Sequence, residues 1–134
     1  MRFVVLVKAN AQSEAGLLPT REQFAEMGKF NEELSKAGVM LAADGLHASS
    51  KGVRLKFTGS GRPAITDGPF AETKELVAGF WIVQGKSKEE IVERFTQAPF
   101  DGGQEIEIRQ IYEIEDFGDF LSDDMREKME AQRR

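Results

Sequence analysis

The sequence contains no cysteine and only one histidine, and both absences limit the chemistry available to the protein. Without cysteine, disulfides, thiolate nucleophiles and cysteine-ligated zinc or iron–sulfur sites are excluded. With His47 alone, a metal site made of several histidines is excluded, as is a mechanism that needs two imidazoles. The remaining residues call for no metal or cofactor, so any imidazole catalysis depends on His47.

Long apolar runs and familiar phosphate or nucleophile motifs are also missing. The apolar stretch at residues 3–7 is too short for a signal peptide, and nothing approaches a membrane-spanning length. We therefore expect a cytoplasmic protein with no membrane contact. No phosphate-binding loop, Gly-x-Ser-x-Gly elbow or dinucleotide fingerprint occurs. The net charge of −5 argues against direct nucleic-acid binding, which requires clustered lysine and arginine.

What is present is typical of one globular domain: 134 residues, 40% of them hydrophobic and 31% charged. Apolar periodicity predicts strands and helices in alternation. A helix over residues 20–37 is indicated by a capping box of Thr20 and Gln23 and by Gly38 after its end. A second helix is expected between Ser87 and Pro99. The expected strands are 3–8, 39–46, 52–59, 63–66, 76–84 and 104–115.

Strand 52–59 has the clearest alternation, with Val53, Leu55 and Phe57 on one face and charged residues on the other. We predict a half-buried strand that turns at residues 59–62 and returns antiparallel through residues 63–66. A second turn follows at residues 67–69. The pair is an inserted β-hairpin.

This order predicts an α+β fold of the ferredoxin-like split βαβ type, with an antiparallel sheet and helices on one face. The other face needs cover. Phe80 and Trp81 are neighbours in one strand, so they point to opposite faces and both faces are apolar there. We therefore predict a homodimer, paired as a dimeric α+β barrel.

The chain changes character near residue 118. We assign residues 1–118 to the domain and residues 119–134 to a C-terminal helical arm capped by Ser122. Its Phe120, Met125 and Met129 are expected to dock on the body or on a partner subunit. A frayed, solvated helix is the alternative.

Two adjacent turns carry the candidate catalytic residues. His47 follows the second strand and is a candidate acid or base, with Asp44 three residues before it as an orienting or binding group. Asp67 lies in a Thr-Asp-Gly-Pro-Phe corner. It either caps that turn through backbone hydrogen bonds or faces His47 across a cleft. A polar residue bonded to backbone is the alternative for His47.

Several other residues are candidates for binding. Gly68 and Pro69 allow another chain or a ligand to approach closely, and Phe70 must pack on its own subunit or on the next. Trp81 can line a pocket or belong to the core. The cations Arg54 and Lys74 can hold an anionic group, although solvation of an exposed strand also explains Arg54.

The stretch TDGPFAETKELVAGFWIV at residues 66–83 resembles the DGPF-domain proteins of the YCII-related family. Supporting resemblance lies in GLH at 45–47, VRLKF at 53–57, FNEELSKAG at 30–38 and QEIEIRQIYEIEDFG at 104–118. The resemblance covers residues 1–118. It implies a ferredoxin-like fold that pairs into dimers with a cleft, and an association with extracytoplasmic-function sigma factors.

YCII relatives carry a His–Asp pair whose histidine lies in or near the first helix, but residues 22–30 of this sequence contain no histidine. That pair cannot be transferred, so a substitute pair of His47 and Asp67 is our own hypothesis. Three functions stay open: a cleft that binds or transforms a small molecule, a non-catalytic regulatory module with Phe70 as its anchor, and a plain structural dimer. Whether the protein is an enzyme is left open.

Overall fold

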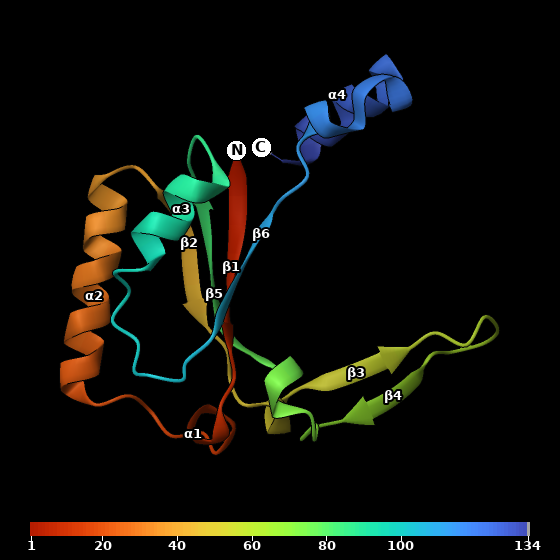
Figure 1. Cartoon of the computed structure of the whole chain (residues 1–134). Helices are drawn as coiled ribbons and strands as arrows, with labels where there is room; N and C mark the ends of the chain where they lie inside the picture. The colour runs from red at the N-terminus through yellow and green to blue at the C-terminus, as the bar shows by residue number, and fades with distance from the viewer. Residues whose placement is uncertain (134) are drawn as a thin grey trace.

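The computed structural model describes residues 1–133 and contains a four-stranded antiparallel sheet with α2 and α3 on one side (Figure 1). Strand order is β2-β5-β1-β6. This order confirms the predicted ferredoxin-like α+β fold. The dimeric pairing stays a prediction. The four strands are β1 Arg2–Lys8, β2 Met40–Gly45, β5 Val77–Gln84 and β6 Ile106–Gln110, and the two helices are α2 Arg21–Lys36 and α3 Lys88–Phe95.

Both helices begin where the sequence predicts. The Thr20 hydroxyl accepts a hydrogen bond from the Gln23 amide, and the Gln23 side chain accepts one from the Thr20 amide. Ser87 accepts from the amide of Glu90 in the same way. Beyond α2, Gly38 has a φ of 72°, a left-handed conformation that favours glycine. None of the helices within residues 1–133 is long and apolar enough to cross a membrane.

The core lies between the helices and the sheet. Phe3 and Val5 of β1 and Val83 of β5 are completely buried there, together with Ile91 of α3. Trp81 packs edge-on against aromatic rings from α2, α3 and the loop after α3, at centroid distances of 5.1–6.2 Å: Phe30, Phe95 and Phe100. The core reading of Trp81 is therefore confirmed. Phe80, its neighbour, faces the opposite side and is half-buried.

The inserted hairpin is present but is not half-buried. Strands β3 Val53–Lys56 and β4 Ala64–Asp67 form a separate two-stranded sheet that projects from the body (Figure 1). Leu55 is 52% exposed and its cross-strand partner Ile65 is 55% exposed. The expectation of a half-buried strand was wrong, because alternation gives a hairpin two distinct faces without supplying an element to cover the apolar one.

Short helical segments were not predicted: α1 Ala11–Glu14, and the 3₁₀ turns η1 Ser49–Lys51, η2 Thr73–Glu75 and η3 Ile114–Phe120. The last predicted strand also ends earlier than expected, at Gln110. The Ile111 amide still donates to the Arg2 carbonyl oxygen, after which the chain leaves the sheet through η3.

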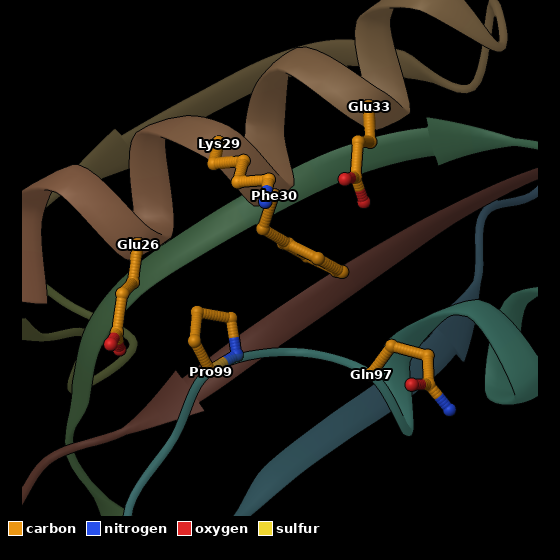
Figure 2. A pocket seen from close by; sticks show the side chains of 6 residues that line it. All are labelled: Glu26, Lys29, Phe30, Glu33, Gln97 and Pro99. Atoms are coloured by element: carbon orange, nitrogen blue, oxygen red, sulfur yellow. The ribbon is translucent and has the colours of Figure 1, made fainter.

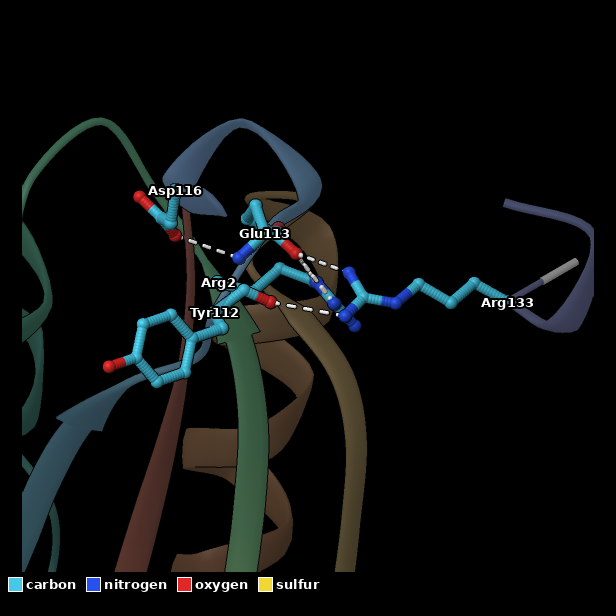
Figure 3. Close-up of polar contacts among 5 residues, drawn as sticks. All are labelled: Arg2, Tyr112, Glu113, Asp116 and Arg133. Carbon is cyan, nitrogen blue, oxygen red and sulfur yellow. Dashed lines mark hydrogen bonds and ion pairs between the residues drawn. The ribbon is translucent and has the colours of Figure 1, made fainter. Parts of the chain in front are cut away.

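The C-terminal helix α4 Asp123–Gln132 is capped by Ser122, as predicted, and contains no buried residue. Figure 3 shows how the chain end is held. The Glu113 carboxylate lies 2.6 Å from the Arg2 guanidinium and 3.2 Å from that of Arg133. Phe120 is 81% exposed, so the expected docking on the body does not involve this ring. The domain division at residue 118 stays a prediction.

Candidate functional site

A cavity of about 330 Å³ lies between α2 and the sheet. Small residues on the strands leave the space, including Ala43 on β2 and Gly79 on β5. Larger side chains form its walls, among them Met27, Trp81 and Phe100. The complete lining is Val7, Pro19, Met27, Asn31, Ala43, Asp44, Gly45, Ala78, Gly79, Phe80, Trp81 and Phe100.

Asn31 is the neutral polar side chain of this lining. Its Oδ1 accepts a hydrogen bond of 2.8 Å from the indole Nε1–H of Trp81. An indole nitrogen only donates, so this bond fixes the amide with its oxygen toward the tryptophan. The amide nitrogen makes no hydrogen bond within residues 1–133.

Asp44 is the one ionisable residue in the lining and is exposed. His47 is exposed too, two residues beyond the lining residue Gly45. Within the described chain, no hydrogen bond or ion pair joins His47 to Asp44 or to Asp67. Asp67 ends β4, opposite Val53, and its side chain is exposed. The His47–Asp67 pair therefore stays a hypothesis.

The Asp-Gly-Pro-Phe corner is attached to the body by a chain of hydrogen bonds. The Ser49 hydroxyl donates to Glu14 Oε2 at 2.5 Å and accepts from the Phe70 amide at 3.0 Å. The Ser49 amide donates to Glu14 Oε1 at 2.9 Å. Both bonds favour the ionised Glu14 carboxylate and so lower the pKa of Glu14 below its ordinary value of 4.5. The bond from the Ser49 hydroxyl has the larger effect.

Gly68 packs directly on the turn that contains Ser49. Its amide donates to the Gly52 carbonyl oxygen at 3.0 Å, and the Gly68–Pro69 peptide bond is cis. A Cβ at position 68 would lie 1.7 Å from the Ser49 carbonyl oxygen. Only glycine fits, so the close approach predicted for this residue is to the protein's own backbone.

The remaining candidate residues belong to this corner or lie beyond it. The Arg54 guanidinium lies 3.7 Å from the centroid of the half-buried Phe70 ring, a cation–π contact. Pro69 and Lys74 are exposed. The structure thus separates the candidates into two groups. Asp44 and Trp81 line the cavity, whereas Arg54, Gly68, Pro69 and Phe70 form the corner.

Three contributing residues were missed at the level of sequence: Glu14, Asn31 and Ser49. The Glu14–Ser49 and Asn31–Trp81 contacts join residues 35 and 50 positions apart. No local spacing identifies such pairs. The capping pattern placed Asn31 on a helix, but did not indicate which residue its amide would meet.

A second, smaller cavity of about 190 Å³ lies between α2 and the chain after α3 (Figure 2). Glu26, Lys29 and Glu33 of α2 face Gln97 and Pro99 across it. None of the sequence-derived candidates lines this hollow. Within residues 1–133, no cluster of three or more potential metal-ligating side chains is found there or elsewhere.

A family model described as the YCII-related domain matches residues 1–115. Among solved structures, the chain is similar to the 5-chloro-2-hydroxyhydroquinone dehydrochlorinase TftG from Burkholderia phenoliruptrix AC1100, in complex with 2,5-dihydroxybenzoquinone. Sequence identity is 16%, and the match covers 84% of this chain and 96% of that chain with a TM-score of 0.42. Among curated proteins, none matches this sequence.

Proposed function

This chain belongs to the YCII-related domain family, and we propose that it binds a small, uncharged and largely apolar molecule in the cavity beneath α2, as a subunit of a homodimer. The supporting observation is the lining itself. Apolar side chains surround the amide of Asn31, whose nitrogen is free to donate. A mostly apolar hollow with a few polar groups is the usual form of a small-molecule site.

The lining also defines the ligand class. Because Trp81 holds the oxygen of the Asn31 amide, the ligand must present an acceptor, such as a carbonyl oxygen, to the nitrogen. The lining contains no lysine or arginine that could hold an anion. Asp44 lies opposite Phe80 in the β2–β5 register, so its carboxylate points to the side of the sheet away from α2. The volume of about 330 Å³ lies at the lower end of the roughly 300–1,000 Å³ typical of ligand sites.

For the homodimer, the support comes from the open face of the sheet. Val4 and Leu6 of β1 alternate with core residues and point away from the helices, as do Phe80 and Ile82 of β5. These four side chains form a half-buried apolar patch, which we call the open face. A second open face would bury it, as expected for a two-fold interface.

If the bound molecule is also transformed, His47 is the proposed acid or base and Asp67 the residue that orients it. The ring ¹H–¹³C NMR signals of His47, compared between the wild type and Asp67→Asn, test the pairing. We expect these signals to shift in the variant, because the substitution removes the carboxylate that faces the imidazole in the proposed pair. Unchanged signals would remove Asp67 from the proposal.

Ligand-observed NMR with small neutral carbonyl compounds tests the binding site. Ala43→Leu fills the cavity from β2, and Ala25→Leu, on the exposed side of α2, is the matched control. We expect compounds that bind the wild type and Ala25→Leu but not Ala43→Leu. Asn31→Asp keeps the acceptor for Trp81 and removes the donor, so it should also weaken binding. Equal binding to all four proteins would contradict the proposed site.

A further inference from the structure

Two oppositely charged segments carry several charges that have no ion-pair partner in the described part of the chain. Residues 51–66, the basic hairpin, contain Lys51, Arg54, Lys56 and Arg62 and no acidic residue. Within residues 1–133 none of these four cations forms an ion pair. Their charges are therefore available to a partner.

The opposite charge lies in residues 113–124, the acidic segment, which contains six acidic residues and no lysine or arginine. Glu113 is paired with Arg2 and Arg133, and Asp124 with Lys128. The other four acidic residues make no ion pair in the described part of the chain: Glu115, Asp116, Asp119 and Asp123.

Both segments also expose apolar side chains. On the basic hairpin, Leu55 and Ile65 share one face and Phe57 is exposed beyond them. On the acidic segment, the ring of Phe120 is almost fully exposed. An isolated two-stranded hairpin is marginal in water, and apolar surface of this kind marks an interaction site.

The placement of the two segments relates them to one partner. Both project on the side of the sheet away from α2 and α3, and they lie at opposite ends of its strands (Figure 1). Two copies can pack with their open faces together, related by a two-fold axis that lies between the two sheets and runs perpendicular to the strands. This axis places each end of one sheet against the opposite end of the other. The basic hairpin of one copy then meets the acidic segment of the other, and the contact occurs twice.

We propose that the basic hairpin is a clamp that seats on the acidic segment of a second copy of this chain, and reciprocally. Charge complementarity selects this occupant, since four unpaired cations meet four unpaired anions of the same sequence. The clamp rests on the proposed homodimer and adds to it the segments that set its orientation.

Sedimentation of charge variants tests the clamp. Lys56→Glu with Arg62→Glu reverses the hairpin, and Glu115→Lys with Asp119→Lys reverses the acidic segment. Each pair should raise the dimer dissociation constant about tenfold or more at low salt. All four substitutions together should return it to within about threefold of the wild type. Lys29→Glu with Lys88→Glu, on the helix-covered side, matches the charge change of the hairpin pair and should leave the constant unaltered.

A dimer that tolerates either reversal, or that is not restored by the combined reversal, would overturn the clamp and leave the homodimer standing. A wild type that stays monomeric at every salt concentration would overturn both. Carbonyl-compound binding, measured on the same variants, is a separate readout of the cavity. The clamp predicts that this binding survives when dimerisation is weakened, because no clamp residue named here lines the cavity.

Discussion

The β1–β5 pair and the β3–β4 hairpin are both antiparallel and both carry apolar side chains, yet only the first is covered by helices on one face. In β1 and β5, most side chains that face α2 and α3 are buried: Phe3, Val5, Trp81 and Val83 are buried and Val7 is half-buried. In the hairpin, the equivalent side chains are about half exposed. The proposed ligand cavity lies on the covered side of the molecule, and the proposed partner surface lies on the uncovered side.

Removal of a core side chain should give the largest effect. Ile91 of α3 is completely buried. Ile91→Ala leaves a cavity and should lower the free energy of unfolding by about 2–5 kcal/mol. Urea titration at low protein concentration measures this change. A loss below about 1 kcal/mol would show that α3 does not cover the sheet as tightly as the structure indicates.

The junction between body and hairpin should be the next most sensitive place. The methyl group of Gly68→Ala would overlap the Ser49 carbonyl oxygen. The backbone shift needed to accommodate it should lower the free energy of unfolding by about 1–3 kcal/mol. Gly59→Ala, at the open hairpin tip where φ is 93°, strains the backbone without a steric clash and is the comparison. We expect hydrogen exchange of the Phe70 amide to accelerate in Gly68→Ala and to stay unchanged in Gly59→Ala.

The ion pair between Glu113 and Arg2 should contribute less to the free energy of unfolding. Glu113→Gln removes a partly exposed ion pair with Arg2, and such pairs contribute about 0–1 kcal/mol. Arg2 and Arg133 lower the pKa of Glu113, so its contribution is present above pH 4.5 and is lost as the pH falls through the lowered pKa. Hydrogen exchange in α4 should therefore accelerate in Glu113→Gln at pH 7. Unchanged exchange would mean that other contacts hold the helix.

The Glu14–Ser49 contact should give a small, pH-dependent effect on the corner. Its bonds favour the ionised carboxylate, so they stabilise the folded state above pH 4.5 and weaken as Glu14 is protonated below its lowered pKa. Glu14→Gln should flatten the pH dependence of stability between pH 5 and about pH 2 relative to the wild type. Glu127→Gln, an exposed site on α4, is the control and should leave that dependence unaltered.

The smallest effect on subunit stability should come from Ile65→Ala, the exposed counterpart of Ile91→Ala. Because the Ile65 side chain is 55% exposed, its truncation should change the free energy of unfolding by less than about 0.5 kcal/mol at low protein concentration. It should still weaken dimerisation, because the partner is proposed to cover this side chain. Sedimentation of the variant at increasing concentration measures this, and a dimer as stable as the wild type would place the hairpin outside the interface.

Local patterns in the sequence predicted the main strands and helices and the fold class, but not the short helical segments. The Thr20 cap, the opposite orientations of Phe80 and Trp81, and the turn at Asp67 were all readable within a few residues. The exposure of the hairpin could not be predicted in this way. The alternation that includes Val53 and Leu55 indicates that the strand has an apolar and a polar face, but not whether another element covers the apolar face. Predicting the Asn31–Trp81 and Glu14–Ser49 contacts requires knowledge of which distant elements pack together.

The single indole N–H signal of Trp81 tests the proposed cavity most directly, since the sequence contains one tryptophan and its Nε1 is bonded to Asn31. The measurement is a ¹H–¹⁵N NMR titration with a neutral carbonyl compound that binds the wild type. The account predicts a saturable shift of this signal in the wild type and in Ala25→Leu, and no shift in Ala43→Leu. A compound that binds while the indole signal stays in place would contradict the proposed site.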